Sequence, residues 1–289
     1  MADVYKGRDQ MLNRYVAIKV LKRLVYDKYS QIAARNEKST CCCSGADKTE
    51  VYNIQTGDYS ELKGYEQDAD LGLGCGVPTK FAGLKPGDTV VDLGSGAGND
   101  CFVARAEVGE SGTVIGVDFS EAMIDKARNN AAKRSYSNVE FRQGDIEEMP
   151  VNGNSVDVVI SNCVLNLLPS KDKIFHEIFR VLKPGGHFCI SDVVTIGTMP
   201  ETLRGAAEMY VGCIAGAIPK NEYMDKILDA GFVSLDVVKE TPIEIPDEIL
   251  SEYLTAEETE QFKRGGSPVF SVTVVGTKSE CGCKSGCCS

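Results

Sequence analysis

Apolar residues of this chain gather in short runs that alternate with amphipathic segments. The runs TVVDLG (89–94) and TVIGVD (113–118) are typical of buried strands, and VEFRQGD, VDVVIS and HFCISDVV predict three more. Between these runs apolar residues recur at helical spacing over 121–133 and 171–182, and Ser120 is placed to cap the first of these helices. Strands that alternate with helices predict an α/β fold with a doubly wound, mostly parallel sheet.

The flanking segments differ in pattern from this central part. Residues 24–35 read as a helix, and the polar loop after them carries three consecutive cysteines. Apolar spacing after the fifth strand predicts a helical insertion, and VSLDVVKETPIEI and SPVFSVTVVGTK predict two late strands. We therefore expect an N-terminal helix with cysteine loops (24–79), a main domain (80–235) containing the helical insertion (195–225), and a small C-terminal α+β region with a cysteine-rich tail (236–289).

The first 22 residues resemble the second and third strands of a bacterial serine/threonine protein kinase, with VAIK placing Lys19 as the phosphate-pairing lysine. A kinase also needs a catalytic-loop Asp and Asn and an Asp-Phe-Gly sequence, which this chain does not contain. We interpret residues 1–23 as a kinase-like fragment without a functional role.

Composition narrows the classes of function. A net charge of −11 argues against a nucleic-acid partner, which requires a basic surface. No apolar run approaches the roughly 20 residues of a membrane helix, and no secretory signal is apparent, so we expect a cytoplasmic protein that acts on small molecules. The twelve cysteines fall into a triplet, a C-terminal cluster and five single positions. This uneven usage suggests thiol chemistry or soft-metal binding rather than a disulfide framework.

The stretch VVDLGSGAGND follows a strand, opens a helix and carries glycines at 94, 96 and 98. Because glycine has no Cβ, the backbone amides of this turn can approach a ligand closely. Its G-x-G-x-G spacing differs from the G-x-G-x-x-G of pyrophosphate-binding loops. Asp118 ends the next strand, where a carboxylate can accept hydrogen bonds from both ribose hydroxyls, and Asp145 follows the third strand, where it can take an adenine amino group. The alternative from these residues is another dinucleotide-binding Rossmann protein.

Together with VLKPGGHFCISD, these motifs resemble the class I S-adenosylmethionine-dependent methyltransferases over residues 84–232. The resemblance implies a Rossmann-like fold and S-adenosylmethionine as the cofactor. The residues it implies for cofactor binding are Asp92, Gly94, Ser95, Gly96, Gly98, Asp118, Met123, Asp145, Ile146 and Asn162.

A cysteine, Cys163, follows the fourth predicted strand, at the edge of the sheet where an active site is expected. Asn162 and Cys163 follow the fourth strand, at the edge where ligands bind, yet SNCVLNLL offers no obvious base. His176 falls on a helix and His187 at the opposite end of a strand. A methyl acceptor with its own lone pair and no proton to lose would need no base, and thiolates hold such soft trivalent centres.

Two further thiols could reach the same edge: Cys75, in a glycine loop expected at the surface, and Cys213, on the helical insertion. Cys101 and Cys189 read instead as small buried hydrophobes. The C-terminal CGCKSGCC is interpreted as an accessory metal-binding segment or a plain tail.

The stretches KYSQIA, GLGCG, SNCVLNL and YVGCIAGA are similar to those of the arsenite S-adenosylmethionine methyltransferases. The resemblance implies that Cys75, Cys163 and Cys213 bind trivalent arsenic. It also implies that a fourth cysteine forms a disulfide with Cys75; Cys43 is the first candidate, and Cys41 and Cys42 are the alternatives.

The implied reaction methylates arsenite and methylarsenite, delivered as thiol conjugates, for arsenic detoxification, with thioredoxin or glutathione as the reductant. Two alternatives remain at this point: a C-, N- or O-methyltransferase of a small metabolite with incidental cysteines, and a non-catalytic soft-metal-binding protein.

Overall fold

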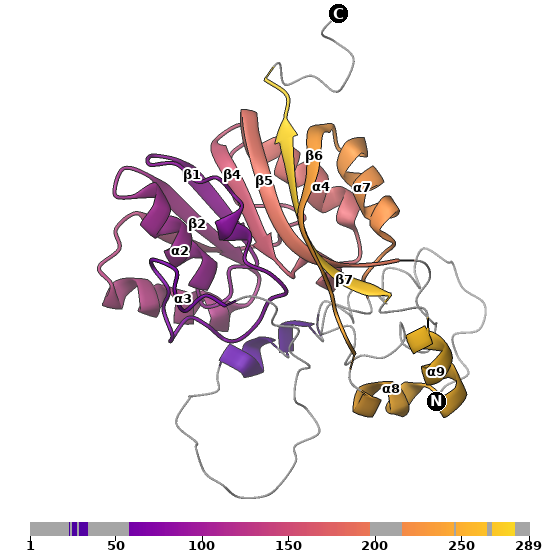
Figure 1. The fold of residues 1–289 in the computed structure, drawn as a ribbon. Helices are drawn as coiled ribbons and strands as arrows, with labels where there is room; N and C mark the ends of the chain where they lie inside the picture. Colours follow the sequence, from indigo (N-terminus) through magenta and orange to yellow (C-terminus); the bar gives the residue numbers. More distant parts are fainter. Residues whose placement is uncertain are drawn as a thin grey trace, which may run out of the picture.

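The computed structural model describes residues 23, 25–27, 29–33, 58–196, 216–245, 247–264 and 268–280. Within this part a seven-stranded sheet has the order β3-β2-β1-β4-β5-β7-β6 (Figure 1). All neighbouring strands are parallel except those that pair with β7, which is antiparallel to β5 and to β6. The strands are β1 (Thr89–Leu93), β2 (Thr113–Asp118), β3 (Val139–Gln143), β4 (Val156–Asn162), β5 (Leu182–Thr195), β6 (Phe232–Pro242) and β7 (Val269–Lys278).

Helices cover both faces of the sheet, which confirms the predicted doubly wound α/β class. Val91 of β1 packs in a core with side chains of α4 and α7, whereas its neighbour Val90 packs in a second core with side chains of α2 and α3. Successive residues of a strand point to opposite faces, so the apolar run of β1 fills both cores. These four helices are α2 (Asn99–Val108), α3 (Glu121–Lys133), α4 (Lys171–Val181) and α7 (Lys220–Asp229).

Local chemistry sets the start of helix α3 where the sequence predicts it. Ser120 is extended and its hydroxyl accepts a hydrogen bond from the amide of Met123 (3.4 Å), which satisfies one of the unpaired amides of the first turn. The predicted range 121–133 matches the observed helix.

The two late strands complete the main sheet. β7 lies between β5 and β6, in register from His187↔Thr277 to Thr195↔Val269. The predicted division between residues 235 and 236 therefore falls inside β6. In the described part of the C-terminal region, the helices are α8 (Asp247–Tyr253) and α9 (Ala256–Arg264).

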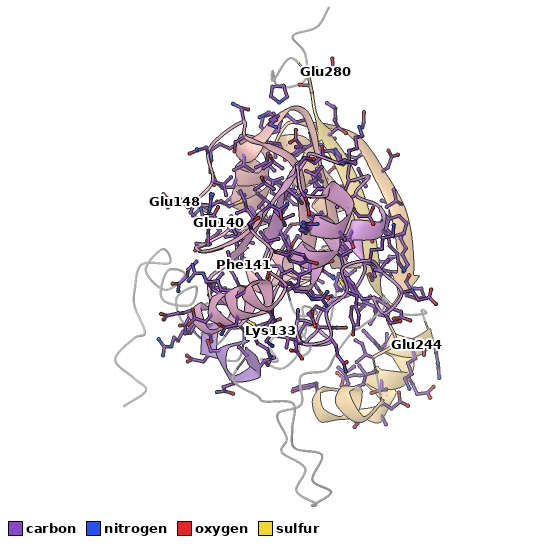
Figure 2. The ribbon with its side chains drawn as sticks, turned by 90° about the vertical axis from the view of Figure 1, so that its left-hand side faces the viewer. Lys133, Glu140, Phe141, Glu148, Glu244 and Glu280 are labelled. Atoms are coloured by element: carbon purple, nitrogen blue, oxygen red, sulfur yellow. The ribbon has the colours of Figure 1, made fainter. Side chains whose placement is uncertain are left out.

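The carboxyl ends of β1, β2, β4 and β5 share one edge of the sheet. β6 ends and antiparallel β7 begins at this edge, so Glu244 lies there and Glu280 lies at the opposite end of the molecule (Figure 2). An apolar cluster at the edge joins Val25, Cys75 and Cys163 to Leu250 and Leu254. No helix among the described residues is long and apolar enough to cross a membrane.

Candidate functional site

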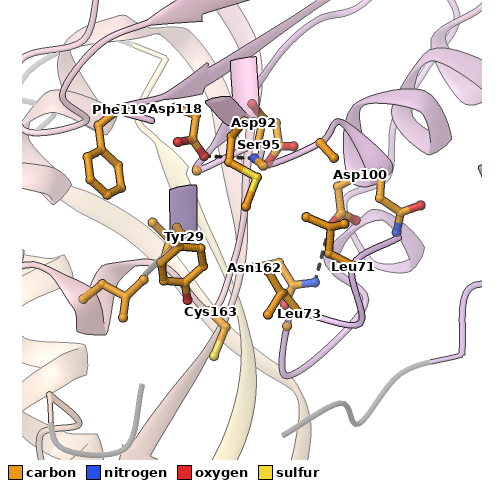
Figure 3. A pocket seen from close by; sticks show the side chains of 18 of the residues that line it. Tyr29, Leu71, Leu73, Asp92, Ser95, Asp100, Asp118, Phe119, Asn162 and Cys163 are labelled. Atoms are coloured by element: carbon orange, nitrogen blue, oxygen red, sulfur yellow. Dashed lines mark hydrogen bonds between the residues drawn. The ribbon is translucent and has the colours of Figure 1, made fainter. Parts of the chain in front are cut away.

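A pocket opens at the carboxyl edge, above the ends of β1, β2 and β4 (Figure 3). Its empty space is about 1310 Å³, part of which is open to solvent. Asp118 and Ser95 lie toward one end, and Asn162 and Cys163 toward the other. The pocket is also lined by Gly74, Asp92, Gly94, Gly96, Asn99, Asp100, Met123, Asp145 and Ile146.

The glycine loop is tied to the end of β2. The amides of Gly94 and Ser95 both donate to the carbonyl of Val117 (2.8 and 3.1 Å), and the amide of Gly96 donates to Asp118 Oδ2 (3.0 Å). Gly96 has a φ of 51°, and a Cβ added there would meet no other atom within 4 Å, so this residue leaves the pocket wall open. Gly98 does not line the pocket: a Cβ there would meet the rings of Phe102 and Phe141, at 2.9 Å each. Gly98 therefore lets the start of α2 pack closely against these two rings.

Asp118 is held as an acceptor at the end of β2. Its Oδ1 accepts a hydrogen bond from the amide of Ser120 (2.8 Å). Burial raises the pKa of Asp118 to about 6, although hydrogen bonds from the backbone, including the one from Gly96, oppose the rise. The carboxylate therefore forms above that pH. Met123, Asp145 and Ile146 line the same pocket.

Two pocket-lining polar atoms are buried and have no hydrogen-bond partner among the described residues, namely Ser95 Oγ and Asn99 Oδ1. Buried polar atoms are almost always paired, so such orphans at a pocket wall are expected to meet a polar ligand. The donor and acceptor set of this wall fits a nucleoside-containing cofactor.

A network that sequence reasoning did not find lies behind the glycine loop. The Cys101 thiol donates to Asp92 Oδ2 (3.2 Å), and burial, followed by the charge of Asp100, raises the pKa of Asp92 well above its usual value. Burial also raises the pKa of Asp100 to about 6, opposed by hydrogen bonds from Tyr59 and Asn162. The only sequence signal for Asp100 was its place in the first turn of the helix after the loop.

Cys163 lies one residue beyond β4 and lines the pocket, with 8% of its surface exposed. Its backbone is left-handed, with a φ of 60°, and its amide donates to the carbonyl of Ser191 (2.7 Å). This backbone conformation is unfavourable for any residue other than glycine, and such strain concentrates at functional sites. The turn ends the strand and leaves Cys163 in the wall of the pocket.

The expectation that Cys75 lies at the surface is wrong, because its exposed fraction is 0%. The glycines on either side let the loop pack against the sheet edge. A Cβ at Gly74 would lie 2.7 Å from Asn162 Nδ2, and one at Gly76 would lie 2.5 Å from Ser191 Oγ. The Cys75 amide donates to Asn162 Oδ1 (3.1 Å), and its carbonyl accepts from Ser271 Oγ.

Cys75 and Cys163 are thus brought into one apolar cluster at the Asn162 end of the pocket. Cys213 and Cys43, with Cys41 and Cys42, lie outside the described residues, as does most of the predicted insertion. Among the residues that the structure does describe, no group of three or more His, Cys, Asp or Glu side chains is arranged to hold a metal ion. A three-thiolate site would need a ligand from outside the described part.

Two other predictions about side chains are confirmed. Cys101 and Cys189 are buried among apolar residues, and the Cys189 thiol donates to the carbonyl of Pro78 (3.2 Å). His187 Nε2 lies 2.6 Å from the carbonyl of Ala82, and its strand position pairs with Thr277 near the far end of β7. This histidine is therefore at the wrong end of the sheet to act at the pocket.

Comparison with known proteins decides the family. Residues 84–231, half of the chain, match the family described as "Methyltransferase domain". The chain belongs to this methyltransferase family. The matched range spans β1 to α7 and so contains the glycine loop, Asp118, Asp145 and Cys163. With β6 and β7, which follow this range, the sheet has the Rossmann-like order of class I S-adenosylmethionine-dependent methyltransferases.

Relatives of this chain include proteins named for different substrates. An arsenite methyltransferase of Halobacterium salinarum is 45% identical over 77% of this chain and 58% of its own length. A demethylmenaquinone methyltransferase of Lactococcus lactis is 35% identical over 56% of this chain and 63% of its own. The crystal structure of an arsenic(III) S-adenosylmethionine methyltransferase from Chlamydomonas reinhardtii superposes with a TM-score of 0.59 at 34% identity, over 68% of this chain and 65% of that one. The chain thus spans little more than half the length of the curated Halobacterium relative.

Proposed function

We propose that this protein transfers the methyl group of S-adenosylmethionine to trivalent arsenic held by the thiolates of Cys75, Cys163 and Cys213. The observation that carries the proposal is the placement of Cys75 and Cys163, distant in sequence, in one buried cluster at the end of the cofactor pocket. Asn162 joins them, because it precedes Cys163 and accepts the hydrogen bond of the Cys75 amide. The similarity to arsenite methyltransferases supports the same substrate.

The pocket walls can hold the cofactor by their own groups. The Asp118 carboxylate would accept hydrogen bonds from the ribose hydroxyls, and Asp145 with Ile146 would face the adenine. Ser95 Oγ and Asn99 Oδ1 would find partners on the bound molecule. When bound, S-adenosylmethionine supplies an electrophilic methyl group. The chain orients it toward Asn162 and Cys163, and this proximity and alignment can contribute roughly 7–11 kcal/mol to catalysis.

The thiol end of the pocket suits an acceptor that has no proton to lose. Asn162 is an amide, and Val164, Leu167 and Leu168 line the wall around Cys163. Thiolates are the ligands that soft trivalent centres prefer, and arsenic bound to them keeps its lone pair for attack. Asn162 shapes this end and needs no acid–base role.

The segment that directly follows the proposed third thiolate, Cys213, contacts this region. Gly216 packs so closely on the backbone of Asn166 that a Cβ would lie 1.9 Å from its carbonyl oxygen, and the Gly216 carbonyl accepts a hydrogen bond from Lys171 Nζ (2.9 Å). Cys213 precedes Gly216 by three residues, so their Cα atoms can be at most about 11 Å apart. Asn166 follows Cys163 by three residues in turn, which supports a shared site.

Electron balance requires a reductant. Transfer of a methyl cation to the arsenic lone pair raises arsenic formally from three to five, and two thiolates that form a disulfide can return two electrons. We propose Cys75 with Cys43, or with Cys41 or Cys42, as that pair. Thioredoxin or glutathione would then reduce the disulfide, and arsenite would arrive as a thiol conjugate in a reducing cytoplasm.

The test is formation of S-adenosylhomocysteine by the full chain with and without arsenite. Arsenite-dependent turnover is expected, and Cys163→Ser and Cys213→Ser should each abolish methylation of methylarsenite. Cys189→Ser, a buried thiol of β5 outside the pocket, is the matched control and should retain turnover.

Other outcomes would point elsewhere. Turnover that does not depend on arsenite would indicate a methyltransferase of a small metabolite. The similarity to a demethylmenaquinone methyltransferase is the observation that favours this alternative. Tight arsenite binding without turnover would indicate sequestration. Full activity in either cysteine variant would refute the proposed triad.

A further inference from the structure

A buried chain of hydrogen bonds runs from helix α2 to the loop that carries Cys75. Asp100 Oδ1 accepts a hydrogen bond from the hydroxyl of Tyr59 (2.8 Å), and this hydroxyl accepts one from Asn162 Nδ2 (2.8 Å). Asn162 Oδ1 in turn accepts from the amide of Cys75 (3.1 Å). Tyr59 and Asp100 are both buried. A carboxyl group of the cofactor pocket is thus connected to the backbone of a proposed arsenic ligand. Figure 3 shows the two pocket-lining members of this chain, Asp100 and Asn162.

These contacts allow the Asn162 amide one orientation. Its nitrogen also donates to the carbonyl of Gly76 (2.9 Å) and lies 3.3 Å from Asp100 Oδ2, while its oxygen faces the amides of Cys75 and Gly76. A reversed amide would set its oxygen against a carbonyl and a carboxylate and its NH₂ against two N–H groups. The Tyr59–Asp100 pair therefore acts with the Gly76 carbonyl and the two loop amides to fix which way Asn162 faces, and so contributes to how the Cys75 loop is held.

We propose that Tyr59 and Asp100 are positioning residues for methyl transfer: through Asn162 they hold the Cys75 backbone beside Cys163 at the pocket edge. The catalytic consequence rests on the proposed function. A misplacement of about 1 Å in the reacting geometry can lower a rate by about 100-fold, so a loosened loop should reduce turnover more than cofactor affinity.

Tyr59→Phe removes the hydroxyl and keeps the ring, and Asp100→Asn removes the charge and keeps the shape. Tyr59→Phe breaks a hydrogen bond to a charged group, and Asp100→Asn replaces the charged acceptor of that bond by a neutral amide, so kcat of the folded enzyme for arsenite should fall by about 10-fold or more in Tyr59→Phe and should also fall in Asp100→Asn. The Kd for S-adenosylhomocysteine should change by less than about threefold in Tyr59→Phe, because Tyr59 does not line the pocket. The double variant should be no slower than the slower single variant, since the two residues act as one unit.

Tyr136→Phe and Asp125→Asn are matched controls, because Tyr136 is half-buried against Phe102 and Asp125 lies on α3, both outside the pocket. Both control variants should have the same kcat as the protein without substitutions. A normal kcat in Tyr59→Phe, or a loss explained wholly by a smaller folded fraction, would overturn the positioning role.

A second measurement separates this inference from the proposed function. The rate at which iodoacetamide modifies Cys75, followed on its peptide by mass spectrometry with Cys75→Ser as the blank, does not depend on arsenic chemistry. It should rise by about 10-fold or more in Tyr59→Phe, because the buried loop opens more often. If the protein without substitutions fails to methylate arsenite but the alkylation rate of Cys75 still rises in Tyr59→Phe, the proposed function is refuted and the positioning role is kept. An unchanged rate would refute the positioning role whatever the substrate.

Discussion

Gly74 offers the sharpest test of how the Cys75 loop is built. Its φ of 130° is open to glycine but unfavourable for a residue with a Cβ. An added methyl group would also meet three side-chain atoms of Asn162, at 2.7 to 3.0 Å. Contacts this short force the amide to move, and this amide holds the backbone of Cys75 and Gly76.

The expected penalty of Gly74→Ala has two parts. A residue in a sparsely populated backbone region costs about 1–3 kcal/mol. Displacing the Asn162 amide weakens its bonds to the Cys75 and Gly76 backbone, at about 0.5–1.5 kcal/mol each. A value in the lower part of this total, about 3 kcal/mol, would fall on a loop that the proposed function requires to be ordered for the chemical step, and it corresponds to a fall in kcat of about 100-fold.

Gly83→Ala separates backbone strain from the clash with Asn162. Gly83 also has a positive φ, 58°, but a Cβ added there would meet nothing within 4 Å. Both variants are to be compared by thermal unfolding and by S-adenosylhomocysteine formation with arsenite. We expect Gly83→Ala to lose some stability and keep its kcat, whereas Gly74→Ala loses turnover. Equal turnover in the two variants would refute the link between the glycine and the placement of Cys75.

Two carboxyl groups give further predictions, both from pKa values raised to about 6 by burial. In the proposed function the ionised Asp118 carboxylate accepts both ribose hydroxyls, so binding of S-adenosylhomocysteine should weaken as the pH falls through 6. Asp118→Asn should bind weakly at pH 8, and its affinity should depend less on pH. Calorimetric titration at pH 5 to 8 checks this, and a pH profile of the variant parallel to that of the original protein would contradict it. Asp192 is fully buried on β5, and its pKa in the folded protein lies above the value of 3.8 in an unfolded chain. The folded state therefore binds the proton of this carboxyl group more tightly than the unfolded state does. The resulting contribution to the free energy of unfolding is complete below pH 3.8 and is lost as the pH rises through 6. This difference is worth about 3 kcal/mol, so Asp192→Asn should remove roughly that much of the fall in the free energy of unfolding between pH 4 and 8 in urea titrations, and an unchanged slope would count against it.

The sequence by itself determined the class of fold, the places of its central strands and the bounds of helix α3. Alternating apolar runs predicted the five central strands, since a strand buried on both faces must be apolar throughout. The start of α3 could be predicted from Ser120, whose hydroxyl caps its own first turn. Asp118 ends one strand and Cys163 directly follows another, which placed both at the edge where the pocket opens, because parallel strands end together.

Only the tertiary structure decided how distant segments meet at that edge. Local pattern could not show that Cys75 is buried, because its burial depends on Asn162, Ser191 and Ser271 of other elements. Nor could it show that Gly98 faces the core while Gly96 faces the pocket, or that Tyr59 reaches Asp100. These contacts join residues far apart along the chain, and their geometry follows from the register of the sheet and the packing of loops upon it. A one-dimensional pattern records the period of each element but not the partner against which it packs.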